Sequence, residues 1–321
     1  MTTLTGDTVA DLFTQTVALA QAGERVSPRG MATHEVLDVN LRLAHPRARL
    51  LVTSGDPGAD RVLNPAFAVA ECVWILSGSD DPWIFDYNSR LRQYAEGGVL
   101  RGAYGPRMRH WSRRIDQLAR VVEILRAEPD SRRAIIQLYD PSKDSVGHKD
   151  VPCTLSFRFH LRQGRLHMAT TMRSQDVWTG MPYDLFTFTV LHELVGGWLG
   201  AELGEYHHHV DSLHIYDQDL DAAETAGSGL SSPPMELLAT PWVGFDPLLR
   251  RVRAGEASGH AGWDAMGATM HSYRLWKQGE QQSARSAATS AGGPLGEGLR
   301  AWYQELEHRR SLQPAVAAGT R

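Results

Sequence analysis

The chain contains few cysteines, no long apolar run and no large excess of charge of either sign. Cys72 and Cys153 are the two cysteines among its 321 residues. Two cysteines are too few for a disulfide framework and are consistent with a reducing compartment. Each of them is therefore either a buried hydrophobic residue or a reactive thiol.

The lack of long apolar runs and of a basic surplus excludes two other classes of protein. No apolar run reaches the roughly 18 to 20 residues that cross a bilayer. The segment Met1 to Asp7 has no basic stretch followed by an apolar one, so we expect no secretory signal and a cytoplasmic protein. A formal net charge of -4 gives no general attraction to nucleic acid. Any anionic ligand must then be bound by local arginines.

What is present is the composition of an ordinary globular protein, 42% hydrophobic and 22% charged. Apolar spacing predicts a helix over residues 8–22, with Gly23 where a C-terminal cap would lie. Residues 66–76 are apolar on every side except at Glu71, which predicts a buried helix that carries one acid. Residues 185–199 predict a second buried helix.

Two alternating segments predict a β-hairpin. Residues 154–161 and 165–172 alternate apolar with polar or small residues, and Arg162, Gln163 and Gly164 between them are typical of a turn. The fold class that follows is α+β, with a largely antiparallel sheet packed with helices. After Trp242 the pattern weakens. Residues 279–298 resemble a flexible linker between helices over 262–277 and 299–310, and the tail after Pro314 is expected to fray.

Cys153 is the candidate nucleophile. Taken alone, a single cysteine is more often structural, as we expect for Cys72. Arg173, however, follows the second strand of the hairpin, just as Cys153 precedes the first. The outer ends of an antiparallel hairpin lie side by side, so the two side chains can meet. A guanidinium at that point would stabilise a thiolate and could hold a phosphate.

Several motifs in this region resemble those of the thymidylate synthase family. They are Glu71 in its apolar helix, Gly102-Ala103-Tyr104-Gly105, Asp130-Ser131-Arg132-Arg133, Pro152-Cys153, the run from Arg173-Ser174-Gln175-Asp176 to Pro182-Tyr183-Asp184, and His214-Ile215-Tyr216. The Tyr104 loop is one residue shorter than the family pattern. The resemblance covers about residues 25–242. It implies a catalytic domain over 1–242 and a C-terminal helical extension over 243–321.

The resemblance implies a one-carbon transfer from 5,10-methylenetetrahydrofolate to C5 of a pyrimidine nucleotide. C5 becomes nucleophilic only after a thiolate adds to C6, which is the role of Cys153. Glu71, on an apolar helix, should have a raised pKa and relay protons. Tyr104 would assist removal of the C5 proton, and Asp176 matches the residue that anchors the pterin ring.

The resemblance also implies how the nucleotide is held. Four arginines would converge on its phosphate: Arg29 (with Arg25 as the alternative) and Arg173 of one chain, and Arg132 and Arg133 of a partner chain. A homodimer with shared sites follows. Ser174 matches a further phosphate contact, and His214 with Tyr216, two apart on a strand, would bind the sugar hydroxyls.

Three alternatives remain beside this hypothesis. His207, His208 and His209 invite a metal site, but consecutive strand residues point to alternate faces and no carboxylate or cysteine stands at a ligand spacing, so we expect no metal. A cysteine hydrolase built on Cys153 would need a positioned histidine that no motif indicates. A catalytically inactive nucleotide-binding regulator would bind nucleotide without releasing the C5 proton.

Asp184 stands where thymidylate synthases carry an asparagine. A carboxyl group can accept from the 4-amino group of cytosine and either donate its proton to N3 or pair with a protonated N3. As in the family's deoxycytidylate hydroxymethylases, Asp184 should therefore select cytosine. Residues Phe85 to Arg90 and the end of the chain lack the tryptophans and apolar terminus with which the methylases exclude water. We therefore expect hydroxymethylation of CMP or dCMP, with CMP slightly favoured and a role in nucleoside antibiotic biosynthesis. Methylation of dUMP is the alternative.

Overall fold

The computed structural model describes residues 2–53, 61–225 and 229–312. Its main sheet has the order β1-β3-β9-β7-β6-β5, with β2 paired to β3 and β8 to β9. The strands of this sheet are β1 (Thr2–Gly6), β2 (Glu24–Val26), β3 (Thr33–Leu43), β5 (Ile135–Gln137), β6 (Thr154–Arg162), β7 (Arg165–Met172), β8 (Gln175–Asp176) and β9 (Glu202–Tyr216). A small second sheet pairs β4 (Val52–Thr53) with β10 (Leu230–Ser231).

The α+β class is confirmed, and the sheet is mixed in direction. The predicted hairpin is β6 and β7, paired antiparallel from Arg162↔Arg165 at the turn to Thr154↔Met172 at the outer end. The long strand β9 pairs antiparallel with β3 but parallel with β7 and β8. Because β7, β8 and β9 run together, residues that follow β7 lie beside the end of β9. Cys153 and the motif after Arg173 are thus assembled at one end of the sheet.

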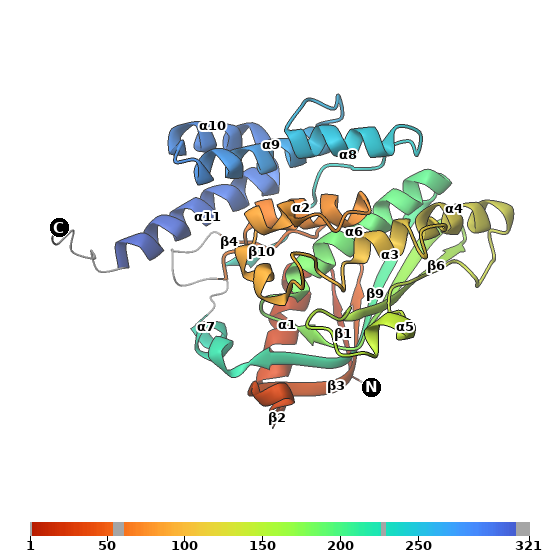
Figure 1. Cartoon of the computed structure of the whole chain (residues 1–321), viewed down its shortest axis with the longest axis horizontal. Helices are drawn as coiled ribbons and strands as arrows, with labels where there is room; N and C mark the ends of the chain where they lie inside the picture. Colours follow the sequence, from red (N-terminus) through yellow and green to blue (C-terminus); the bar gives the residue numbers. More distant parts are fainter. Residues whose placement is uncertain (1, 54–60, 226–228, 313–321) are drawn as a thin grey trace.

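Helices cover the sheet on one side and extend away from it (Figure 1). The α-helices are α1 (Val9–Gln21), α2 (Pro65–Leu76), α3 (Tyr104–Arg109), α4 (Gln117–Ala127), α5 (Pro141–Asp144), α6 (Met181–Leu199), α7 (Leu220–Thr225), α8 (Phe245–Ala254), α9 (Ala261–Lys277), α10 (Gln281–Ala291) and α11 (Gly293–Leu312). Short 3-10 helices are η1 (Pro28–Gly30), η2 (Pro82–Asp86), η3 (Ser89–Tyr94) and η4 (Asp217–Asp219). Within the described ranges, no helix is long and apolar enough to cross a membrane.

The predicted first helix is α1, but Gly23 has a different role from the one expected. The cap residue is Ala22, in right-handed geometry. A Cβ on residue 23 would lie 2.5 Å from the carbonyl oxygen of Glu35 on β3. Glycine is therefore needed for the close approach of the α1–β2 turn to the strand, and not to end the helix.

The two predicted buried helices are confirmed as α2 and α6, which pack on each other. Asn64 caps α2 by accepting hydrogen bonds from the amides of Ala66 and Phe67. Every α2 residue is buried except Glu71, which is partly exposed. Helix α6 ends at Gly200, which takes up the left-handed conformation at φ 66°. Glu71 of α2 and Asp184 in the first turn of α6 therefore lie on helices that pack against each other.

The prediction of a flexible linker over 279–298 is wrong. These residues form α10 and the first turns of α11, and Ala284, Ala288 and Ala291 are buried against the neighbouring helices. Alanine is the best helix former and its small side chain permits close packing, so a Ser- and Ala-rich segment folds once an apolar face is available. The predicted frayed tail after Pro314 lies outside the described residues.

The C-terminal helices belong to the same hydrophobic core as the rest of the chain. Helices α8, α9 and α11 contact α2, and in Figure 1 they lie on the side of α2 that faces away from the sheet. Tyr273 of α9 stacks on Tyr87 with ring centroids 5.6 Å apart, and Arg274 donates to the Tyr87 hydroxyl at 3.0 Å. The helices after Trp242 therefore pack against α2, the helix that carries Glu71, and support its position.

Candidate active site

Cys153 and Arg173 meet at the outer end of the β6–β7 hairpin, as the sequence predicts. The Arg173 amide donates to the Cys153 carbonyl at 2.9 Å, and Arg173 Nη2 lies 3.6 Å from Cys153 Sγ. The guanidinium also donates to the carbonyl oxygens of Pro152 and Val151, both at 2.9 Å. These bonds hold an exposed arginine in a fixed direction beside the thiol, where it can also meet an anion.

Burial raises the pKa of the Cys153 thiol, and the positive charge of Arg173 opposes that shift without reversing it. The resting residue is therefore a thiol in spite of the nearby guanidinium. Arg29 also lowers this pKa, so its charge acts at the thiol. Arg25, the alternative phosphate ligand, is paired with Asp217 at 2.7 Å. The charge of Arg29 therefore reaches the thiol, whereas the guanidinium of Arg25 is paired with Asp217.

Tyr104 lies beside the residue that follows the thiol. Its hydroxyl accepts from the Thr154 amide at 3.2 Å and bonds the Thr154 hydroxyl at 3.1 Å. Burial raises the pKa of Tyr104 well above its ordinary value. The shorter loop before Tyr104 therefore still brings a neutral phenol to the Cys153 end of β6.

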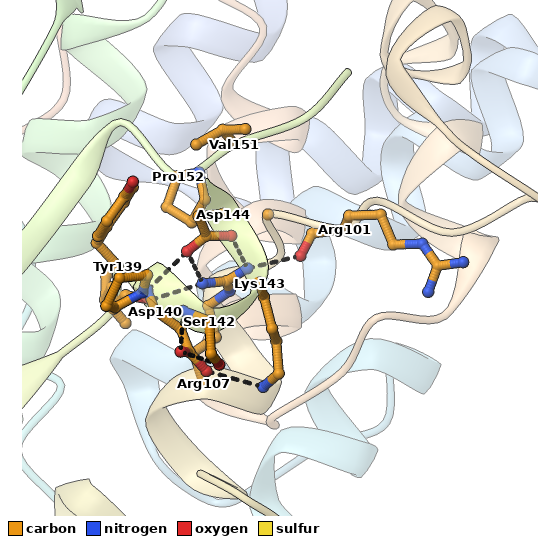
Figure 2. Close-up of polar contacts among 12 residues, drawn as sticks. Arg101, Arg107, Tyr139, Asp140, Ser142, Lys143, Asp144, Val151 and Pro152 are labelled. Carbon is orange, nitrogen blue, oxygen red and sulfur yellow. Dashed lines mark hydrogen bonds and ion pairs between the residues drawn. The ribbon is translucent and has the colours of Figure 1, made fainter. Parts of the chain in front are cut away.

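A buried ion pair joins the Tyr104 helix to the segment before Cys153 (Figure 2). Arg107 of α3 donates to both oxygens of Asp144, at 2.6 and 2.7 Å, and to the carbonyls of Leu138 and Arg101. The Asp140 amide donates to Asp144 at 2.7 Å. A bidentate pair that is hydrogen-bonded on all sides is rigid. It holds α3, the helix that begins at Tyr104, against α5 and the end of the segment after β5.

Glu71 and Asp184 are two acids with raised pKa values. Burial raises the pKa of Glu71 to about 8, with a further contribution from the charge of Asp184. Burial raises the pKa of Asp184 to about 7; the hydrogen bond from Gln175 opposes this shift, and the Asp176 carboxylate adds to it. At neutral pH Glu71 is therefore mainly protonated, and Asp184 is balanced between its two forms. Groups in that state can exchange protons with a substrate.

Gln175 is a residue of the site that the sequence reasoning missed. Its Nε2 donates to Asp184 Oδ2 at 2.9 Å, and its Oε1 lies 2.9 Å from Nε2 of His208. Both Gln175 and His208 are buried. The signal available in the sequence was an amide side chain inside the motif, in alternation with the apolar Val177.

Other predicted residues lie in the same region. Asp176 Oδ1 accepts from the amides of Trp178 and Thr179, and its Oδ2 from the Thr179 hydroxyl, so the turn fixes this carboxylate. His214 and Tyr216 share one face of β9, with ring centroids 5.2 Å apart. Ser174 is partly buried between Arg173 and β8.

Arg132 and Arg133 are not brought to the thiol within one chain. Both are exposed in the loop between α4 and β5, and Arg133 pairs with Glu128 at 2.5 Å. None of the contacts found among the described residues joins either arginine to Cys153 or Arg173. Within one chain these two arginines therefore stand apart from the thiol.

The three consecutive histidines alternate across β9, as expected for a strand. His208 is fully buried, whereas His207 and His209 lie on the opposite face with ring centroids 6.5 Å apart. Across residues 2–53, 61–225 and 229–312, no group of three or more His, Cys, Asp or Glu side chains is placed to hold a metal ion.

The chain is similar in sequence to proteins of a known family. The thymidylate synthase family model matches residues 24–237. Deoxyuridylate hydroxymethyltransferase of Bacillus phage SP01 is 35% identical over 240 residues, which cover 70% of this chain and 61% of the phage protein. The proteins of the same name from Pseudomonas phage M6 and Delftia phage PhiW-14 are each 33% identical, over 59% and 56% of this chain and 52% of their own lengths. The chain thus spans about half to three fifths of the curated relatives it matches. It belongs to the thymidylate synthase family.

Proposed function

We propose that this protein is a cytidylate 5-hydroxymethylase, which adds a one-carbon unit from 5,10-methylenetetrahydrofolate to C5 of CMP or dCMP. The observation that carries the proposal is Asp184, a carboxyl group with a pKa of about 7 at the position where thymidylate synthases hold the base with an amide. Cytosine offers an N4–H donor and an N3 acceptor. A protonated carboxyl offers the complementary acceptor and donor.

The nucleophilic step belongs to Cys153. Its sulfur adds to C6, and the electron pair of the C5–C6 bond becomes available at C5 for attack on the one-carbon unit. Methylenetetrahydrofolate supplies that unit as an electrophile. The thiol has to lose its proton as the nucleotide binds, and Arg173 at 3.6 Å stabilises the thiolate that forms.

Glu71 and Tyr104 move the remaining protons. Glu71, with a pKa of about 8, is protonated at neutral pH and can donate to the base or to the departing folate nitrogen. The hydroxyl of Tyr104, next to Thr154, is placed to help remove the C5 proton. Cleavage of the bond between the one-carbon unit and the folate nitrogen leaves an exocyclic methylene on C5. Water adds to this methylene and loses one proton, and elimination of the Cys153 sulfur from C6 restores the C5–C6 double bond and releases the hydroxymethyl product.

The folate-facing group of this chain is Asp176, whose orientation is fixed by the turn at Trp178 and Thr179. A partly exposed carboxylate fits the N–H donors of a pterin ring, so the residues present suit this co-substrate. Water as the quencher is supported by the segment from Phe85 to Arg90, which lacks the tryptophans with which the methylases exclude water. The printed names of the three phage relatives also support a hydroxymethylated product.

The phosphate site requires two chains in this proposal. Arg29, Arg173 and Ser174 would come from one protomer, and the exposed Arg132 and Arg133 from its partner. Four guanidinium groups repel one another unless a dianion lies between them, which is why a nucleotide monophosphate suits the set. His214 and Tyr216 would contact the sugar.

A second candidate is hydroxymethylation of uridylate, favoured by the names of the phage relatives. One experiment separates the two. CMP, dCMP, UMP and dUMP are each incubated with the enzyme and methylenetetrahydrofolate, and the nucleotide product is analysed by mass. We expect a gain of one CH2O unit on a cytidylate. Turnover confined to uridylates would reject the proposal, and a methyl product would reject the water step.

A further inference from the structure

A buried chain of hydrogen bonds ends on Asp184. Tyr206 OH lies 2.7 Å from the Thr170 hydroxyl and 2.9 Å from Nδ1 of His208. His208 Nε2 lies 2.9 Å from Gln175 Oε1, and Gln175 Nε2 lies 2.9 Å from Asp184 Oδ2. The first four residues are at most 3% exposed. The chain thus runs from β7 through β9 and β8 to the first turn of α6.

The donors in this chain all point toward Asp184. Gln175 Nε2 also lies 3.5 Å from the Asp176 carbonyl, so it faces two oxygens and must be the amide nitrogen. The amide oxygen can only accept, which puts a proton on Nε2 of His208. Burial lowers the pKa of His208 to about 3, so the ring is neutral and its Nδ1 accepts from Tyr206. The direction of the hydrogen bonds is therefore fixed by the amide and by the single ring proton.

That direction matters because a neutral carboxyl group can exchange the roles of its two oxygens. With the proton on one oxygen it matches cytosine, and with the proton on the other it matches uracil. The N–H of Gln175 occupies a lone pair of Oδ2 and favours Oδ2 as the carbonyl oxygen. Oδ1 then carries the proton. Asp184 offers an acceptor and a donor in one fixed order.

We propose that Gln175, held by His208, is the positioning residue that gives Asp184 its cytosine-matching order of acceptor and donor. This inference rests on the proposed function, because it takes Asp184 as the group that reads the base. The charged and titratable groups whose fields also reach Asp184 are Glu71, Asp176, Tyr104, Cys153 and Tyr206. Without Gln175 the hydrogen bond that distinguishes Oδ2 from Oδ1 is lost, and selectivity between the bases should fall.

The experiment measures kcat/KM for CMP and for UMP, or for the deoxy pair if that pair is preferred. Gln175→Met removes the donor at similar length, and Gln175→Glu keeps the shape but places an acceptor against Asp184. We expect each variant to lower the cytidylate-to-uridylate ratio by about 10-fold or more, with nucleotide affinity through the phosphate little changed. His208→Gln should lower the ratio in the same direction.

A matched control is His192→Gln. His192 is another fully buried histidine, but it bonds the Leu166 carbonyl and not the chain that leads to Asp184. It should leave the ratio within about 2-fold of wild type. Equal losses on both nucleotides, or an unchanged ratio in soluble Gln175→Glu, would overturn the inference. A wild-type preference for uridylate would instead reject the proposed function, and the effect of Gln175 on the ratio would still decide the positioning role.

Discussion

Nη2 of Arg173 lies 3.6 Å from Sγ of Cys153, while other hydrogen bonds of the same guanidinium go to main-chain carbonyls of residues 151 and 152. The arginine is thereby fixed before any ligand arrives. A thiol whose pKa is raised by burial needs such a neighbour, because the thiolate has to form in a partly desolvated place. In the proposed mechanism, this pair allows a cysteine that rests as a thiol to become a nucleophile.

The first prediction concerns this cysteine. Cys153→Ser should reduce turnover to below about 1% of wild type, because an alkoxide is far harder to form than a thiolate. Nucleotide binding, measured by calorimetry, should persist since the arginines remain. Cys72→Ala is the control, because Cys72 is fully buried and burial raises the pKa of its thiol well above the ordinary value, which makes it unreactive. It should retain activity. Cleavage of a substrate without folate would favour a cysteine hydrolase.

The second prediction concerns assembly. Arg132→Ala and Arg173→Ala should each be inactive, and a mixture that exchanges subunits should recover about one quarter of wild-type activity. About half of the dimers would be hybrids, each with one intact site. The control mixture pairs Arg173→Ala with Cys153→Ser. Cys153 and Arg173 of a site come from the same protomer in this proposal. Each site of a hybrid dimer would therefore carry one of the two changes, and no activity should return. Absence of complementation, with exchange demonstrated by mass, would contradict the shared site.

The third prediction concerns stability and pH. The folded-state pKa of Glu71, about 8, lies above its ordinary value of 4.5, so the unfolded chain holds fewer protons between these values. The contribution of Glu71 to the free energy of unfolding is therefore fully present below pH 4.5 and is lost as the pH rises toward 8. Glu71→Gln should raise Tm at pH 8 and change it little at pH 5, while activity is lost. An equal Tm shift at both pH values would contradict the raised pKa.

The fourth prediction concerns the ion pair that links the Tyr104 helix to the Cys153 segment. Asp144→Ala leaves the buried guanidinium of Arg107 without its partner, which should cost about 3–5 kcal/mol in the free energy of unfolding. Urea denaturation measures this cost. Asp140→Ala, which removes the cap of α5, should cost about 1 kcal/mol. Similar costs for the two variants would show that the pair contributes no more than a cap.

Much of this arrangement was predictable because the sequence patterns are local. Alternation specified the β6–β7 hairpin, and the hairpin placed Cys153 beside Arg173. The helix of Glu71 followed from an apolar run with one acid. Gln175 was not predictable in this way, since its importance depends on β8 and β9 lying parallel, and no local pattern reveals that pairing. The helix over 281–291 was missed because Ser and Ala are common in linkers, and tertiary packing decided the outcome.

The central claim is that Asp184 reads the base as cytosine, and Asp184→Asn tests it most directly. Unlike a carboxyl group with its single proton, the amide has two N–H donors, so it can point one at the 4-position while Gln175 turns its amide oxygen to accept the other; that N–H opposes the amino group of cytosine and suits O4 of uracil. Measured as kcat/KM on CMP, dCMP, UMP and dUMP, the variant should lose about 10- to 1000-fold on the cytidylates and gain on the uridylates. Full cytidylate activity in Asp184→Asn, or a wild-type enzyme that already prefers uridylates, would contradict the account.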